Sequence, residues 1–370
     1  MWSEREKSLG IETVTYRPLE ASGRHYRFGV ELYNVIQRTW PRLHHLYWNF
    51  LEIANLLRRA WALVGVGHFA PFLQAENPDA IVSVHPHLNH GFFELARAVL
   101  GDRVRLVTYC GDMSDGYGFS RHWVNGASDG FLAATEACRE AALRRGMPES
   151  RARVGGFMLE PAGHAPPFSE AERTRFLGDE FGLDAKVFTL LLATGGVGAN
   201  NHTAFLRAMD RARLPCQVIA LCGRHPAVLA RVQAWTPRTR GLVVRCLPYT
   251  RRMPDILRSV SAVVTRGGAG TTGESIMASC PIITNCLGGS MPQECITMAF
   301  LKKHGLLRRV DRPGDLPAIL APWLENPADH REARERTRHC HPGGHPRQIL
   351  EDLRHLVGRG VFPSDAGHSH

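Results

Sequence analysis

The chain has 370 residues, enough for two ordinary domains, and its 44% of hydrophobic and 22% of charged residues are typical of a folded protein rather than a disordered one. Its 45 Lys and Arg against 35 Asp and Glu give a formal net charge of +10. This charge favours an anionic partner, which is a phosphorylated ligand, a membrane surface or a nucleic acid. Nine cysteines without a C-x-x-C pair exclude a disulfide scaffold and indicate a reducing compartment.

The N-terminal sequence MWSEREKSLG has no apolar core and is not a signal peptide. The longest uncharged stretches, 60–75 and 275–293, are too short or are broken by Gly and Pro, so neither is a transmembrane helix. These features predict a cytoplasmic protein that is soluble or lies on a membrane surface.

Short β-branched runs alternate with helix-like stretches along the chain, which is typical of parallel βαβ units. The first set of predicted strands comprises residues 11–18, 79–86, 104–109, 130–135 and 152–157. A Pro- and Gly-rich segment follows at 160–168 and is interpreted as an interdomain hinge. The second set of predicted strands comprises residues 187–196, 216–223, 241–249, 261–268 and 280–286.

The predicted fold class is therefore α/β, with two Rossmann-like domains that face a cleft, one at 1–160 and one at 169–340. A Rossmann-like domain opens with its central strand and a Gly-rich turn. Here the chain opens with a helix-like stretch that leads directly into the first predicted strand. We expect the N-terminal domain to lack its first strand and Gly-rich loop, either because that unit is absent or because the reading frame starts too late.

The strongest chemical signal is the segment TRGGAGTTGESIMASCPIITN. A strand runs into Gly267, Gly268 and Gly270, where missing Cβ atoms let a ligand approach the backbone, and then into a helix whose N-terminal amides suit a diphosphate. Glu274 lies inside that helix, where its carboxylate can accept hydrogen bonds from two ribose hydroxyls. A second Gly-rich turn, 193–201, follows the first strand of the same domain. Either turn alone also fits close packing, but the two together predict a nucleotide cleft.

Further motifs follow one another in a fixed order through the second half of the chain. They are Gly195 and Gly196, then Cys222, Gly223 and Arg224, then Tyr249 and Met253, then Gly268, Ala269, Gly270 and Thr271 with Glu274, and finally Gln293 and Glu294. In order and spacing this half closely resembles the GT-B glycosyltransferase family of the monogalactosyldiacylglycerol synthases and MurG-type transferases. The resemblance extends to the first half, where PDAIVSVHP and Asp112 match the synthase pattern more closely than the MurG pattern.

The resemblance implies roles in binding a UDP-sugar. Tyr249 would lie against uracil, Glu274 would hold the ribose, and the Gly-rich turns, with the amides of residues 268–271, would meet the diphosphate. Gln293 and Glu294 would hold hydroxyls of the transferred hexose.

Enzymes of this family need no metal ion, because amides, a helix dipole and a basic side chain stabilise the departing UDP. Arg224 or Arg266 would supply that positive charge. The alternative is that both are surface charges and that Tyr249 is a core residue. We expect no metal and no cofactor, the UDP-sugar being the donor substrate.

Inverting transfer also needs a base that takes the proton of the acceptor hydroxyl. In the synthases the first βα turn is a Gly-rich loop that ends in a His, and this His would be that base or would lie next to it. No residue of this chain matches that loop. The remaining candidates are Asp112, in a turn after a predicted strand, and His85, at the end of VSVHP. A turn Asp often caps the backbone and a His beside Pro is often structural, so Asp112 is favoured only slightly. The motif HPHLNH has no carboxylate or Cys nearby and is not interpreted as a metal site.

The segment 24–64 interleaves Trp and Tyr with Arg, which suits a surface of anionic lipid headgroups. A buried helix pair whose Arg face water fits nearly as well. The corresponding region of the lipid galactosyltransferases is thought to face the membrane, which favours a lipid acceptor.

We therefore predict an inverting, metal-independent hexosyltransferase that moves a hexose from a UDP-hexose to a membrane lipid such as diacylglycerol. Its predicted partners are the UDP-hexose, the lipid acceptor and an anionic membrane surface, with no nucleic acid. We expect it peripherally on the inner face of the plasma membrane. The resemblance also implies that a C-terminal helix within 341–370 returns to the N-terminal domain before a disordered tail. Alternatives are a non-catalytic sugar-nucleotide-binding protein, one subunit of a split glycosyltransferase, and a UDP-sugar epimerase.

Overall fold

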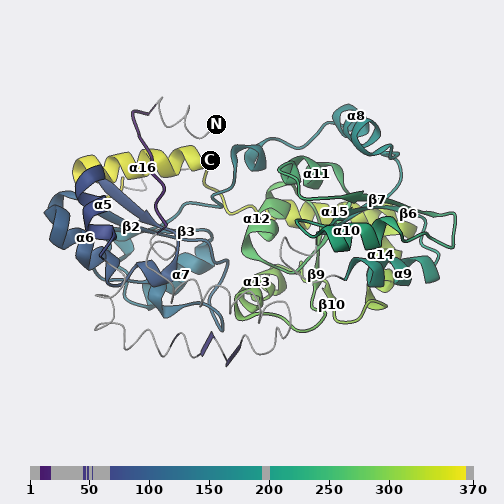
Figure 1. Ribbon diagram of the computed structural model, residues 1–370, viewed down its shortest axis with the longest axis horizontal. Helices are drawn as coiled ribbons and strands as arrows, with labels where there is room; N and C mark the ends of the chain where they lie inside the picture. The colour runs from purple at the N-terminus through teal and green to yellow at the C-terminus, as the bar shows by residue number, and fades with distance from the viewer. Residues whose placement is uncertain are drawn as a thin grey trace. The chain divides into compact units, whose positions relative to one another are not determined.

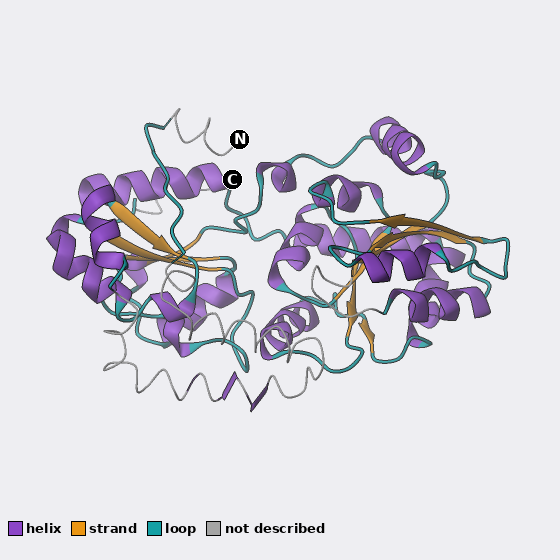
Figure 2. Cartoon of the chain, in the orientation of Figure 1, coloured by secondary structure: helices purple, strands orange, loops and turns teal. Residues whose placement is uncertain are grey.

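The structure is a computed structural model that describes residues 9–17, 45–46, 48–49, 52, 67–193 and 201–363. The chain divides into two compact units. The second unit is Leu159–His341, and the first contains the described residues before Leu159 together with those from Pro342 onward. Each unit contains a parallel sheet with helices packed against it (Figure 1, Figure 2). The predicted α/β architecture with two parallel-sheet units is thus confirmed.

The first unit contains a four-stranded parallel sheet in the order β1-β2-β3-β4. Its strands are β1 Ala80–Ser83, β2 Arg105–Cys110, β3 Gly130–Ala133 and β4 Ala152–Val154. Ser83 pairs with Thr108, and Ala133 lies opposite both Cys110 and Val154. The carboxyl ends of these strands therefore lie along one edge of the sheet, and the loops that follow β1 and β2 leave from that edge.

Helices cover both faces of this sheet. They are α5 Phe69–Glu76, α6 Phe92–Leu100, α7 Glu136–Arg144 and α16 Pro346–Arg359, with short 3-10 helices η2 Pro86–Leu88, η3 Gly101–Arg103, η4 Arg121–Trp123 and η5 Glu149–Arg151. Leu106 of β2 packs in a cluster with α5 and α6, whereas the next residue, Val107, packs in a cluster with Ile349 and Leu356 of α16. Because successive strand side chains point to opposite faces, α16 covers the face away from α5 and α6.

The strand predicted at 11–18 does not form. Residues 11–17 pair with no strand, and Tyr16 instead stacks on Phe72 of α5 with ring centroids 4.1 Å apart. A β-branched run becomes a strand only where a neighbouring strand offers backbone partners, and here aromatic packing against a helix replaces them. The predicted lack of a first strand and Gly-rich loop depends on residues outside the described ranges and stays a prediction.

The second unit contains a six-stranded parallel sheet in the order β10-β9-β8-β5-β6-β7. Its strands are β5 Thr189–Ala193, β6 Cys216–Leu221, β7 Leu242–Leu247, β8 Ala262–Thr265, β9 Ile282–Asn285 and β10 Arg309–Val310. Strand β10 is only two residues long and was not predicted from the sequence. The chain runs outward from β5 through β6 to β7 and then returns to β8 on the other side of β5. This reversal is a topological switch point, and in open α/β sheets ligands bind at the carboxyl ends of the strands there.

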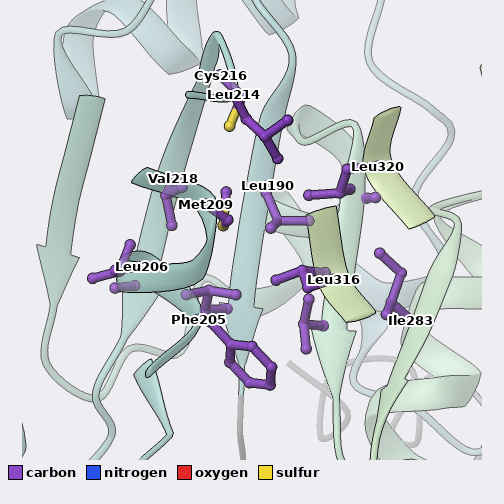
Figure 3. Packing of buried hydrophobic residues seen from close by; sticks show 14 of the residues in the cluster. Leu190, Phe205, Leu206, Met209, Leu214, Cys216, Val218, Ile283, Leu316 and Leu320 are labelled. Carbon is purple, nitrogen blue, oxygen red and sulfur yellow. The ribbon is translucent and has the colours of Figure 1, made fainter. Parts of the chain in front are cut away.

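The helical elements of the second unit are η6 Pro161–His164, α8 Glu170–Phe181, α9 His202–Arg211, α10 Pro226–Gln233, α11 Met253–Ser259, α12 Ala269–Met277, α13 Pro292–Lys303, α14 Asp315–Glu325 and α15 Pro327–His339. Figure 3 shows the core on one face of the sheet, where Phe205 of α9 and Leu316 of α14 pack with Leu190 of β5. Leu190, Phe205 and Leu316 are fully buried. This core fixes the central strand and, with it, the carboxyl edge that carries the Gly-rich turns.

Candidate functional site

The turn between β8 and α12 leaves backbone donors open to a ligand. Thr272 donates the first intrahelical bond of α12, to the Gly268 carbonyl, so the amides of Ala269, Gly270 and Thr271 have no acceptor within the helix. Gly268 and Gly270 are exposed, and a Cβ on either would meet no heavy atom within 4 Å. The positive end of the helix dipole adds to this set of donors, so the turn is suited to bind an anion such as a diphosphate.

Glu274 lies in the same helix as a partly buried carboxyl group. Burial and, to a smaller extent, the nearby charge of Glu160 at the start of η6 together raise its pKa to about 7. The side chain forms no hydrogen bond with another residue in the described part of the chain. A carboxylate that lacks protein donors is suited to accept hydrogen bonds from the hydroxyls of a ligand.

Arg224 and Tyr249 meet at the ends of adjacent strands. Arg224 follows β6, Tyr249 follows β7, and these two strands pair along their length. The guanidinium carbon of Arg224 lies 4.2 Å from the centroid of the Tyr249 ring, and 48% of Tyr249 is exposed. Tyr249 is therefore not a core residue, and the pair presents an aromatic ring and a positive charge together.

Arg266 is already engaged by the protein. It forms an ion pair with Glu294 at 3.0 Å and donates to the carbonyls of Leu287 and Gly289, and its side chain is 12% exposed. Glu294 is 2% exposed and also accepts from the Met291 amide at the start of α13. These contacts tie the loop after β9 to the end of β8. The geometry favours a structural role for this pair and leaves Arg224 as the better candidate for a cation beside the leaving group.

Gln293 precedes Glu294 in α13 and, unlike Glu294, has a side-chain oxygen that is not used within the described part of the protein. Its Oε1 is buried and has no hydrogen-bond partner among the described residues. Of the two residues predicted to hold the hexose, Gln293 is thus the one that retains an unused acceptor.

Two substitutions should separate the roles of the arginines. Arg266→Met should lower the free energy of unfolding by about 3 kcal/mol, because it leaves Glu294 charged, buried and unpaired. Arg224→Met should change stability by less than about 0.5 kcal/mol, because Arg224 is exposed, but it should weaken UDP binding. Urea titration and calorimetry with UDP measure the two effects. Loss of stability in Arg224→Met with UDP affinity retained would reverse the assignment.

In the first unit, Asp112 lies two residues beyond β2 at the carboxyl edge of the sheet. Its Oδ2 accepts a hydrogen bond of 2.7 Å from the indole Nε1 of Trp123. Burial raises the pKa of Asp112 to about 6, and the Trp123 hydrogen bond opposes that rise. A carboxylate with this pKa is ionised at neutral pH and is a stronger base than an exposed Asp.

His85 lies at the same edge of the sheet, after β1. Its Nδ1 accepts from the amide of His87 at 3.3 Å and caps η2, and its ring lies 5.1 Å from that of His87. This cap is the structural alternative that a His beside Pro suggests. His85 as a catalytic base stays a prediction, and the geometry favours Asp112.

Several predicted features lie outside the described residues. These are Gly195 and Gly196 and most of the segment 24–64. Within that segment, Glu52 is described and is buried, and it accepts a hydrogen bond of 2.6 Å from the Ser120 hydroxyl. Neither the role of Trp123 nor the contact of Glu52 was predicted from the sequence, because no local pattern links residues this far apart.

Two negative findings hold for the described residues. Within those ranges no group of three or more His, Cys, Asp or Glu side chains is placed to hold a metal ion. Every helix in the same ranges is too short or too polar to span a bilayer.

The chain is similar in sequence to known glycosyltransferases. Residues 190–293 match the family model of the glycosyltransferase family 28 C-terminal domain. Monogalactosyldiacylglycerol synthase 1, chloroplastic, of Arabidopsis thaliana is 24% identical over 319 residues, which cover 83% of this chain and 56% of that protein. The processive diacylglycerol beta-glucosyltransferase of Staphylococcus epidermidis is 21% identical over 303 residues, which cover 81% of this chain and 73% of that protein. The chain thus spans about half the length of the plant synthases that it matches, 56% for the first.

Among solved structures, MurG of Acinetobacter baumannii superposes with a TM-score of 0.59 at 17% identity, over 79% of this chain and 77% of that chain. This likeness and the two parallel-sheet units define a GT-B fold, as predicted. The sequence thus resembles GT-B glycosyltransferases, and the match to the family 28 C-terminal domain lies within the second unit.

Proposed function

We propose that this chain transfers a hexose from a UDP-sugar to a membrane lipid such as diacylglycerol, with inversion and without a metal ion. The observation that carries the proposal is the start of α12, where open amides lie in the same helix as a carboxylate that accepts no hydrogen bond from the described residues. The amides of Ala269, Gly270 and Thr271 bind the diphosphate, and Glu274 binds the ribose. Tyr249 lies against the uracil, Arg224 supplies the positive charge beside the diphosphate, and Gln293 accepts a hydrogen bond from the hexose.

The chemical step needs one proton transfer and one displacement. Asp112 takes the proton of the acceptor hydroxyl while that oxygen attacks the anomeric carbon of the hexose. The bond between this carbon and the diphosphate oxygen breaks, and its electron pair leaves with UDP. The amides and dipole of α12, with Arg224, stabilise the charge that develops on UDP, which is the role a metal ion plays elsewhere.

The names of two relatives support the lipid acceptor. Both relatives described above carry a diacylglycerol substrate or product in their names. The net charge of +10 favours an anionic surface, and the aromatic and Arg residues of 24–64 are the proposed contact with it. We place the protein peripherally on the inner face of the plasma membrane, with a UDP-hexose and a lipid as its ligands.

A transfer assay with radiolabelled UDP-galactose or UDP-glucose and diacylglycerol liposomes tests the proposal. We expect labelled lipid from the wild type with at least one donor. Glu274→Gln should weaken UDP binding by about 1 to 3 kcal/mol by calorimetry at pH 8, because hydrogen bonds to a charged acceptor are worth about that. UDP binding without lipid product from either donor would favour the non-catalytic alternative.

The pKa of about 7 for Glu274 gives this test a second readout. Lowering the pH from 8 to 6 protonates the carboxylate and should weaken UDP binding more in the wild type than in Glu274→Gln. The variant is the necessary reference because phosphate groups of UDP titrate in the same range. The pKa in the folded protein lies above the ordinary value of 4.5, so the stability that Glu274 contributes is full below that value and is lost as the pH rises through about 7.

Glu274→Gln should therefore be at least as stable as the wild type at pH 8, although it binds UDP less well. A carboxylate that only held the fold together would show the opposite result. Glu170→Gln, at an exposed Glu in the same unit, serves as the matched control and should alter neither property.

A further inference from the structure

The indole of Trp123 is the group that fixes Asp112. Trp123 is 6% exposed and forms the last residue of η4, eleven residues beyond Asp112. Its N–H donates to Asp112 Oδ2 at 2.7 Å, while Oδ1 forms no hydrogen bond with another described residue. The carboxylate therefore has one oxygen engaged and one oxygen available.

The backbone of Trp123 is itself held in place. Asn89, which is fully buried, donates from Nδ2 to the carbonyls of both His122 and Trp123, at 3.1 and 3.0 Å. At the other end of η4, Ser120 caps the helix and donates to Glu52 at 2.6 Å. Both ends of the short helix are thus anchored by buried polar groups.

The loop that carries Asp112 is anchored on its other side. Met113 is fully buried, and its carbonyl accepts a hydrogen bond of 2.6 Å from the Thr135 hydroxyl. Cys110, at the end of β2, has a thiol whose pKa burial raises well above its ordinary value, so it stays neutral beside the carboxylate. The distance between Trp123 and Asp112 is consequently set by two rigid supports.

We propose that Trp123 is a positioning residue for Asp112: its N–H holds Oδ2 and turns Oδ1 toward the acceptor hydroxyl. The proposal rests on the proposed function, in which Asp112 is the base. An indole N–H is a donor only, so it orients the carboxylate without offering a competing acceptor for the proton. Without this bond the carboxylate rotates about χ2, and a base that is misplaced by about 1 Å loses up to about 100-fold in rate.

Trp123→Phe tests the role because it removes the N–H and keeps an aromatic ring. We expect kcat to fall roughly 10- to 100-fold, with the KM for the UDP-sugar unchanged. The hydrogen bond lowers the pKa of Asp112, so its removal should raise that pKa and move the acidic limb of the pH profile of kcat to higher pH. Carboxyl ¹³C NMR of the protein without substrate should show the same displacement of the Asp112 titration.

Trp123→His is the second variant, because its five-membered ring places Nε2 where the indole N–H lies and should recover part of kcat above pH 7. It also keeps the test valid if Trp123→Phe does not fold. Phe119→Leu is the matched control, since Phe119 is buried on the same loop but packs under Arg145, and its pH profile should match the wild type.

Wild-type kcat and a wild-type Asp112 titration in a folded Trp123→Phe would overturn the positioning role and leave the proposed function standing. No sugar transfer by the wild type would instead defeat the proposed function, and this role with it.

Discussion

Asp112→Asn should lower kcat for sugar transfer by roughly 10²- to 10⁴-fold, the usual contribution of general-base catalysis. Asn has nearly the same shape, and its side-chain oxygen can still accept from the Trp123 indole, so the loop keeps its anchor. Binding of UDP should be unchanged, because the proposed UDP contacts all lie in the second unit. Steady-state kinetics with saturating UDP-sugar and calorimetry with UDP measure the two quantities.

The pH dependence of kcat provides a second test of Asp112 as the base. With a pKa of about 6, Asp112 is ionised above that pH and can take a proton, so wild-type kcat should fall as the pH is lowered through about 6. The residual activity of Asp112→Asn should lack this acidic limb. The pKa in the folded protein exceeds the ordinary value of 3.8, so the stability contributed by Asp112 is lost as the pH rises through about 6. At pH 8 the variant should therefore be no less stable than the wild type.

Asp115→Asn is the matched control on the same loop. Ion pairs with Arg145 and Arg144 lower the pKa of Asp115 to about 2, so it stays ionised throughout the assay range. The stability that this carboxylate contributes is present above pH 3.8 and is lost only as the pH falls through about 2. The variant should lose some stability at pH 7 and retain the acidic limb of kcat. A large loss of kcat in Asp115→Asn, or wild-type kcat in Asp112→Asn, would remove Asp112 as the base.

Every described strand except β10 could be predicted from the sequence, because these runs are apolar or β-branched and are bounded by turn residues. The predicted strand at 187–196 contains β5, and the predicted strand at 261–268 contains β8. Both predicted runs end in two Gly residues. The run 11–18 is also rich in β-branched residues, yet residues 11–17 lie outside any sheet. Composition reports what fits a pleated strand, whereas the presence of a neighbouring strand is a tertiary property.

The candidate site likewise contains features that could be predicted from the sequence and contacts that could not. The turn at 268–271 and Glu274 could be predicted because a strand, a Gly-rich turn and a helix are contiguous in the chain. The ion pair between Arg266 and Glu294 spans 28 residues, and the contact of Trp123 with Asp112 spans 11. Such contacts depend on how loops pack. The sequence therefore predicted Arg266 and Glu294 as polar groups near a ligand but did not reveal that they bind each other.

One backbone crossing in the first unit permits no side chain. Gly155 and Gly156 follow β4, and Gly343 and Gly344 precede α16. A Cβ on Gly344 would lie 2.6 Å from the Gly155 carbonyl oxygen, and one on Gly156 would lie 2.5 Å from the Gly343 carbonyl oxygen. The Tyr109 hydroxyl donates to the Gly156 carbonyl at 3.1 Å and accepts from the Met158 amide at 2.9 Å, which ties the crossing to β2.

Gly344→Ala should lower the free energy of unfolding by about 3 to 5 kcal/mol, since a left-handed residue costs about 1 to 3 kcal/mol and backbone overlap costs at least as much again. Gly343→Ala is the matched control, because Gly343 has a similar φ of +67° against +76° but its Cβ would meet nothing within 4 Å. It should lose only about 1 to 2 kcal/mol. Paired urea titrations followed by tryptophan fluorescence measure the difference, and equal losses would show that the crossing tolerates a side chain.

The same pair of variants tests whether the backbone crossing influences the position of Asp112. Tyr109 precedes Cys110, the last residue of β2, and Asp112 lies two residues beyond it. If Gly344→Ala separates the two backbones, the Tyr109 hydroxyl must release the Gly156 carbonyl or move with it, and the loop that carries Asp112 moves with β2. Under conditions where both variants remain folded, transfer activity should therefore fall further in Gly344→Ala than in Gly343→Ala. Equal activities would mean that the supports at Met113 and Trp123 hold Asp112 independently of the crossing.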